Sequence, residues 1–256
     1  MLPFDYPFDG HGLFAHLAKV SDDGQSGGEQ NPHIAGLVTV SFSGVSPDPS
    51  HSQVHKIVGN VDEGYCCTDN RLLSWISVDL GGLRRLCPKH YCLKNDGLGD
   101  YHSLRNWELQ GKEAEDGDWV VLKAHTDDAA LASKAFASAG WPLVPRSRSA
   151  ASYGEARAEA DIREGLQGEH GEHVFYRYFR ILQTGPNTYG ANIITCGGME
   201  FYGELREYSP AASTPVVPAA PPTLVPVDNH VMEDTAMITP TSEEGNGAGL
   251  TTMPNE

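Results

Sequence analysis

Hydrophobic and polar residues alternate with a period of two in several short stretches of this chain, which is the pattern of a half-buried β-strand. The clearest stretches are residues 37–44, 74–81 and 175–182. In the last of them Phe179 and Ile181 fall on one side, and the residues that alternate with them fall on the other. We expect the apolar side of each stretch to face a core.

Four more stretches favour strands, at residues 87–94, 106–111, 119–124 and 198–203. Residues 115–118 between two of them contain Asp-Gly, a strong hairpin signal. We expect residues 175–182 to pair with 74–81 and with 104–111. Strands spread this widely, with little helical periodicity between them, predict an all-β fold of antiparallel strands. Such folds more often bind other molecules than transform them.

Composition divides the chain into three parts. Residues 1–29 form a lead-in, in which residues 12–20 predict a short helix before a stretch rich in Gly and Ser. Residues 30–208 carry the strand patterns. Residues 209–256 are rich in Pro, Ala and Thr and poor in large apolar residues, so we expect a disordered acidic tail.

Residues 146–172 interrupt the strand pattern with Ala, Glu, Arg and Gly. Within them, residues 153–166 fit a short solvated helix, and we interpret the segment as an insertion between two strands. A partner-binding helix is the alternative, but its apolar residues are mostly alanines, which are too small to fill a groove. Residues 129–139 fit either a helical turn or a loop.

The chain is acidic, with a formal net charge of −16. Residues 209–256 hold six carboxylates and no Lys or Arg, which leaves −10 for residues 1–208. An acidic protein without a Lys/Arg stripe repels phosphate backbones, so we expect no nucleic-acid partner. Because the sequence has no run of 18 apolar residues, we expect no membrane span.

The five cysteines form an odd set, Cys66, Cys67, Cys87, Cys92 and Cys196. Residues 1–7 contain neither a basic region nor an apolar run, so we expect no secretory signal. We therefore favour reduced thiols in an intracellular, cytoplasmic setting over a disulfide framework.

A set of short motifs follows in a fixed order along the chain. They are Trp75–Gly81, Pro88–Tyr91, Leu104–Trp107, Gln110–Gly111, Asp116–Trp119, Leu122, His125, Trp141–Pro142, Arg177–Ile181, Gln183–Gly185, Asn187 and Glu200–Gly203. Together they resemble the coagulation-factor V/VIII type C, or discoidin, domain, and most of all the intracellular variant found in HECT-type ubiquitin ligases and BTB proteins. The resemblance covers about residues 30–206 and implies a galactose-binding-like jelly-roll β-sandwich. No segment resembles a HECT catalytic domain, a BTB domain or a RING finger, so the resemblance implies the module and not ligase activity.

In discoidin-like domains three loops build the ligand end, and by this resemblance they are residues 45–55, 62–74 and 96–105, with the turn 185–192 beside them. The candidate ligand-binding residues are Asp69, Asn70, Arg71, His102, Arg105, Asn187 and Tyr189. Such a set fits sugar hydroxyls and equally a peptide main chain or carboxylate, to which Arg offers a bidentate contact. Arg105 is as much a candidate for a buried structural ion pair, and exposed loop residues without a ligand remain an alternative for the whole set.

The four tryptophans, Trp75, Trp107, Trp119 and Trp141, lie beside strand or turn signals. Burying a large aromatic side chain stabilises a fold by about 1.5–3 kcal/mol. We therefore expect these four to pack in the core rather than to stack on a ligand.

Metal binding has little support, and we expect no cofactor. His90 and Cys92 share a strand face that Cys87 does not, so buried free cysteines are favoured over a zinc site. Some domains of this fold carry a structural calcium, for which the candidate ligands are Asn60, Asp62, Glu63 and Asp69.

Catalytic motifs are missing from the sequence: it has no Gly-x-Ser-x-Gly, no phosphate loop and no His-Glu-x-x-His. His125 with Asp127 and Asp128 is explained by a strand that ends in a turn. We expect a non-catalytic binding module whose partner is a protein segment, associated with ubiquitin ligation, and the alternative is a carbohydrate-binding module that recognises a glycan.

Overall fold

The structure is a computed structural model, and it describes residues 1–20, 30–51, 53–59, 66–147 and 173–209. The predicted insertion, with the helix expected at residues 153–166, and the predicted tail lie almost wholly outside these ranges. The described residues belong to one compact unit, Met1–Ala212. None of their helices is long and apolar enough to cross a membrane.

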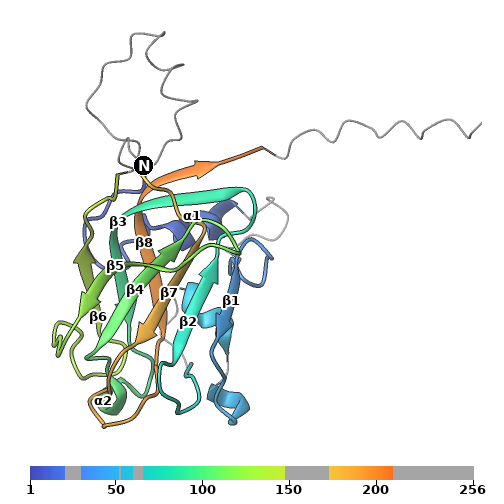
Figure 1. Cartoon of the computed structure of the whole chain (residues 1–256). Coiled ribbons are helices and arrows are strands. Elements are labelled where there is room, and N and C mark those ends of the chain that lie inside the picture. The colour runs from blue at the N-terminus through green and yellow to red at the C-terminus, as the bar shows by residue number, and fades with distance from the viewer. Residues whose placement is uncertain (21–29, 52, 60–65, 148–172, 210–256) are drawn as a thin grey trace, which may run out of the picture. The chain divides into compact units, whose positions relative to one another are not determined.

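Two antiparallel β-sheets make up this unit (Figure 1). The five-stranded sheet has the order β1 (Thr39–Phe42), β2 (Trp75–Asp79), β7 (Tyr178–Gln183), β4 (Trp107–Lys112), β5 (Val120–His125). The three-stranded sheet has the order β6 (Ser138–Pro142), β3 (Arg84–Lys94), β8 (Gly198–Glu207). The chain passes repeatedly from one sheet to the other, as in a jelly roll, so the predicted all-β sandwich is confirmed.

Strand pairing in the large sheet follows the alternation seen in the sequence. β7 lies between β2 and β4, as expected for residues 175–182. Ile181 is in register with Ile76 on one side and with Leu109 on the other, and all three side chains are almost fully buried. The Asp-Gly hairpin joins β4 to β5 as predicted.

Short helices cover the ends and one side of the sandwich. They are α1 (Leu13–Val20), η1 (Pro49–His51), η2 (Val54–Val58) and α2 (Gly99–His102). α1 confirms the helix expected at residues 12–20, and its Leu13, Phe14 and Leu17 are buried in the main core. The N-terminal segment also pairs with the edge of β8, where Leu2 and Gly203 exchange two backbone hydrogen bonds. Residues 1–20 are thus packed on the sandwich.

β6 is a strand that the sequence pattern did not indicate. The residues Ser138-Ala-Gly-Trp-Pro142 include no β-branched side chain, and Gly and Pro are unfavourable in strands. The strand forms because it pairs with β3, where Trp141 lies opposite Tyr91 and Gly140 lies opposite Cys92. Tertiary pairing overrides the weak local preference at this position.

The tryptophans divide into two pairs. Trp107 and Trp141 are buried in the core, as expected. Trp75 and Trp119 are only half-buried, because they lie on the outer face of the large sheet. Trp119 there packs against the guanidinium of Arg180, 4.4 Å from the ring centroid, so it covers a charged side chain rather than the core.

We predict that Gly203→Ala destabilises the fold by about 2 kcal/mol or more, since it adds strain and an overlap in a packed sheet. Gly203 has a φ of 151°, and a Cβ there would lie 2.2 Å from the carbonyl oxygen of Cys87. Urea unfolding measures the change. Gly82→Ala is the control, because a Cβ at Gly82 meets nothing within 4 Å. Equal stabilities of the two variants would contradict this reading of the β3–β8 pairing.

Candidate functional site

Three loops meet at the end of the sandwich where α2 lies, the lower end in Figure 1. The backbone N–H of Arg71 donates to the carbonyl oxygen of Asn192 at 3.3 Å, and the N–H of Asn192 donates to Oδ1 of Asn70 at 3.0 Å. These bonds join the loop before β2 to the loop after β7.

The loop after β7 is joined to α2 in the same way. The N–H of Thr188 donates to the carbonyl oxygen of Ser103 at 3.1 Å, and the Thr188 hydroxyl donates to the backbone carbonyl oxygen of Tyr101 at 2.6 Å. The buried Ser74 hydroxyl lies 2.9 Å from the carbonyl oxygens of both Arg71 and Asn192. We call residues 69–74, 99–103 and 187–192 together the loop platform.

Arg71 is held in one orientation on this platform. Its Nε donates to Oδ2 of Asp69 at 2.9 Å, its Nη2 pairs with the same oxygen, and its Nη1 donates to the carbonyl oxygen of Ser43 at 3.0 Å. About half of the side chain, 52%, is still exposed. Asp69 and Ser43 therefore orient a guanidinium that solvent or a partner can reach.

His102, Asn187 and Tyr189 lie together on the platform. Asn187 is buried, donates from Nδ2 to the carbonyl oxygen of Ile193, and accepts the N–H groups of Tyr189 and Ala191 on Oδ1. The His102 ring meets the Tyr189 ring edge-on at 5.1 Å, and burial lowers the pKa of His102. Asn187 thus shapes the turn, whereas Tyr189 is exposed.

Arg105 directs its guanidinium into the protein. Nη1 donates to the carbonyl oxygens of Leu104, Asp128 and Leu131, at 3.0, 3.2 and 2.9 Å, and Nη2 donates to the Ser133 hydroxyl at 2.8 Å. The sequence analysis offered a buried ion pair as one role for Arg105, but here backbone carbonyl oxygens accept its hydrogen bonds in place of a carboxylate. Arg105 positions the loop that follows β5.

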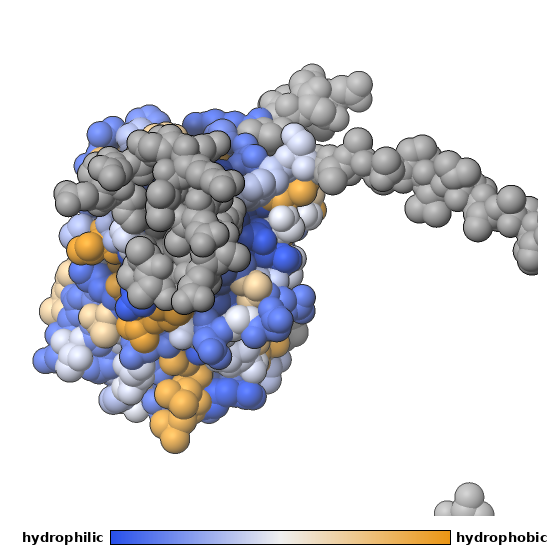
Figure 2. Space-filling view, turned by 45° about the horizontal axis from the view of Figure 1, so that its top comes forward, coloured by the Kyte–Doolittle hydropathy of each residue, from blue (hydrophilic) through white to orange (hydrophobic). Residues whose placement is uncertain are grey.

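Four large hydrophobic side chains are exposed on the platform that carries Arg71, and the sequence analysis selected only Tyr189 among them. The exposed fractions are 79% for Leu72, 60% for Leu73, 63% for Tyr101 and 69% for Tyr189. The side of the molecule seen in Figure 2 is mainly hydrophilic, with separate hydrophobic groups. Two adjacent leucines inside a polar loop were the signal that could have indicated a contact surface.

Leu73 has a backbone φ of 58°, a left-handed conformation that costs a non-glycine residue about 1 kcal/mol or more. We predict that Leu73→Gly leaves the free energy of unfolding unchanged or raises it by up to about 1 kcal/mol, while it weakens partner binding. Thermal unfolding and a binding titration measure the two effects. A clear loss of stability would show that Leu73 supports the fold instead.

The structure describes only some of the candidate metal ligands. Among the described residues, only Asp5, Asp9 and His11 place three suitable groups near one another. The two Asp9 oxygens already accept the backbone N–H groups of Asp5 and His11. The ring of His90 stacks on Phe4, and the calcium candidates Asn60, Asp62 and Glu63 lie outside the described residues.

His125 and Asp128 belong to a buried network between the sheets. His125 Nδ1 lies 2.6 Å from Oδ2 of Asp128, and its Nε2 lies 2.6 Å from the Tyr91 hydroxyl, which also accepts the indole N–H of Trp107. The imidazole is 2% exposed, and burial lowers its pKa. Because a substrate has no access to this ring, the network has a structural role in the core.

No family model matches the chain, and no curated protein matches it. Among solved structures it is similar to CpGH89CBM32-5 from Clostridium perfringens, in complex with GalNAc-β-1,3-galactose, at TM-score 0.45 and 8% identity over 66% of this chain and 96% of that chain. It is similar to CBM32-3 from a family 31 glycoside hydrolase of the same organism, at TM-score 0.44 and 8% identity over 66% and 92% of the two chains. It is also similar to a fucolectin from striped bass (Morone saxatilis) serum, at TM-score 0.43 and 14% identity over 65% and 47%. The resemblance to the variant in HECT-type ligases and BTB proteins stays a prediction.

Proposed function

We propose that this protein is a non-catalytic binding module that recognises a protein segment on the loop platform. One observation carries the proposal: three loops joined by hydrogen bonds carry an oriented Arg71 together with four exposed hydrophobic side chains, Leu72, Leu73, Tyr101 and Tyr189. A surface of this kind is fixed before a partner arrives, so little conformational entropy is lost on binding.

The residue types on the platform fit a peptide. Aromatic rings and Arg are the side chains that most often dominate protein–protein binding energy. Two aliphatic side chains beside Arg71 favour a segment that covers them with its own apolar residues. The exposed side of the guanidinium then meets a carboxylate or a main-chain carbonyl of that segment.

Selection from a displayed random-peptide library on the full chain tests the proposal. We expect enriched peptides to bind the wild type, and the double change Leu72→Ser with Leu73→Ser to weaken them by at least about tenfold, since two apolar contacts are removed. Ile34→Ser is the matched control, because Ile34 is 63% exposed and precedes the opposite end of β1. Equal losses of peptide affinity in the two variants, or a failure to enrich any peptide, would exclude the platform as a peptide-binding site.

Arg71→Ala separates the charge from the apolar contacts. We expect it to weaken the same peptides while it changes the free energy of unfolding by less than about 1 kcal/mol, because a half-exposed ion pair contributes little to stability. His102→Ala is expected to behave in the same way. A large drop in the melting temperature would make these residues structural.

Glycan binding is the second candidate, and the exposed Tyr189 ring beside His102 favours it. An aromatic face with neighbouring polar groups is suited to a sugar ring. A glycan array on the full chain distinguishes the two candidates: hits that Tyr189→Ala abolishes would replace the peptide proposal.

The wider setting is also a proposal. We propose an intracellular module associated with ubiquitin ligation, on the resemblance of its motifs. Five buried free cysteines are in keeping with a reducing compartment. Localisation of the tagged chain in cells, followed by proximity labelling, would test both parts.

A further inference from the structure

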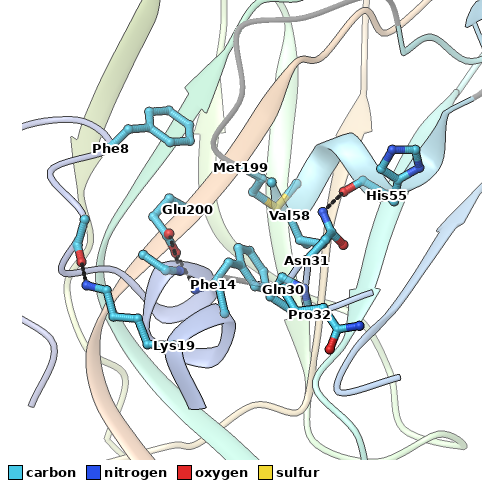
Figure 3. Close-up of a pocket in the computed structure, with 14 residues that line it drawn as sticks. Phe8, Phe14, Lys19, Gln30, Asn31, Pro32, His55, Val58, Met199 and Glu200 are labelled. Atoms are coloured by element: carbon cyan, nitrogen blue, oxygen red, sulfur yellow. Dashed lines mark hydrogen bonds between the residues drawn. The ribbon is translucent and has the colours of Figure 1, made fainter. Parts of the chain in front are cut away.

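A cavity separate from the loop platform lies between α1, η2 and β8 (Figure 3). Its volume is about 380 Å³, which is within the range of small-molecule sites. Phe8, Phe14, Val58 and Met199 line it with apolar surface. Glu200 also lines the cavity, and its carboxylate accepts hydrogen bonds from the start of α1 (Figure 3).

Glu200 is a buried acid without a cationic partner. One of its oxygens, Oε1, accepts the N–H groups of Phe14 and Phe201 at 2.8 and 2.9 Å, while Oε2 accepts only that of Ala15, at 3.1 Å. Within the described part of the chain, no Lys, Arg or His forms an ion pair with it. Oε2 therefore keeps the capacity to accept a further hydrogen bond.

Burial has a measurable consequence for this acid. It raises the pKa of Glu200 to about 7, the three backbone N–H groups oppose that rise, and the negative charge of Asp9 adds to it. A buried carboxylate is stabilised when a cation comes within contact distance.

We propose that this cavity binds a small organic amine, whose ammonium group meets Glu200 while its apolar body packs among Phe8, Phe14 and Met199. Aromatic faces also attract cations, but the Lys94 ammonium already lies 4.6 Å from the centroid of the Phe8 ring. The ligand nitrogen is therefore placed at Glu200 rather than at Phe8. The available volume suits a compact body such as a phenylethyl group.

The other charged groups near the cavity favour an amine over an acid. Asp9 and the ionised form of Glu200 are negative, so a ligand carboxylate would be repelled at this wall. The Lys19 ammonium donates to the carbonyl oxygen of Gly10 at 3.0 Å and is exposed. Burial and the neighbouring Lys56 lower the pKa of His55, so this imidazole is neutral at pH 7.

Calorimetric titration of the full chain with 2-phenylethylamine tests the proposal. The controls are 2-phenylethanol, which has the same body without charge, and 3-phenylpropanoate, which reverses the charge. We expect the amine to bind at least about tenfold more tightly than either, because only the amine pairs with Glu200. Equal affinity of amine and alcohol, or no binding of the amine, would overturn the proposal.

Variants locate the binding. We expect Glu200→Gln to remove the preference for the amine, and Asp118→Asn, an exposed acid on the β4–β5 hairpin, to leave it unchanged. If Glu200→Gln unfolds, Ala15→Leu decides, since it narrows the cavity and keeps every Glu200 hydrogen bond. Amine binding that survives Ala15→Leu at full strength would place the site elsewhere.

Discussion

Replacing Trp107 by Ala is expected to lower the free energy of unfolding by about 4 kcal/mol, the largest effect of any single change considered for this fold. The Trp107 side chain is fully buried, stacks on His125 with ring centroids 4.0 Å apart, and meets Trp141 edge-on. Its indole N–H donates to the Tyr91 hydroxyl at 3.0 Å. The change therefore opens a cavity between the sheets and removes a buried hydrogen bond.

Trp107→Phe separates these two contributions. It keeps an aromatic ring in the core but removes the N–H donor, so we expect a smaller loss of about 1–2 kcal/mol. Chemical denaturation of the wild type, Trp107→Ala and Trp107→Phe measures both losses of stability. In Trp107→Ala the pKa of His125 should also rise toward its ordinary value as water reaches the ring, which imidazole NMR titration detects. A loss below about 1 kcal/mol in Trp107→Ala would contradict the assignment of this network to the core.

Replacing Glu200 by Ala is expected to cost about 3 kcal/mol, because the backbone N–H groups of Phe14, Ala15 and Phe201 lose their acceptor. Two of these groups start α1, so the damage should concentrate in that helix. In a hydrogen-exchange experiment, the backbone amides of Leu13–Val20 should lose protection. The amides that pair β2 with β7 should remain as protected as in the wild type. Uniform loss across the molecule would argue against a local role for Glu200.

The same variant has a predicted pH dependence. Burial raises the pKa of Glu200 from 4.5 to about 7, so the folded state binds more protons than the unfolded state between these values. The contribution of Glu200 is thus fully present below pH 4.5 and declines as the pH rises through 7. We expect the difference in the free energy of unfolding between wild type and Glu200→Ala to be larger at pH 5 than at pH 8. A difference that grows as the pH rises would contradict the raised pKa of Glu200.

The strand patterns predicted most of the sandwich because burial on one face imposes a period of two. Ile76, Val78, Phe179 and Ile181 alternate with outward-facing residues, and their strands pair as expected. β6 could not be predicted in this way, since its partner on β3 is about fifty residues away in sequence and supplies the pairing.

The candidate site was predictable only in part. The resemblance indicated the three loops, but it did not distinguish exposed side chains from those that bond inside the chain, such as Arg105 and Asn187. The cavity was not predictable, because Glu200 and Phe14 are separated by 186 positions and meet only when the N-terminal segment packs on β8. Contacts of this range leave no local pattern.

The central claim is that the loop platform is the recognition surface, and backbone NMR on the full chain with a library-selected peptide tests it most directly. The account predicts that amide shifts concentrate at residues 69–74, 99–103 and 187–192. It also predicts that the double change at Leu72 and Leu73 removes these shifts. Shifts centred on β5 and β6 or on the α1 cavity, with the platform unchanged, would contradict the claim.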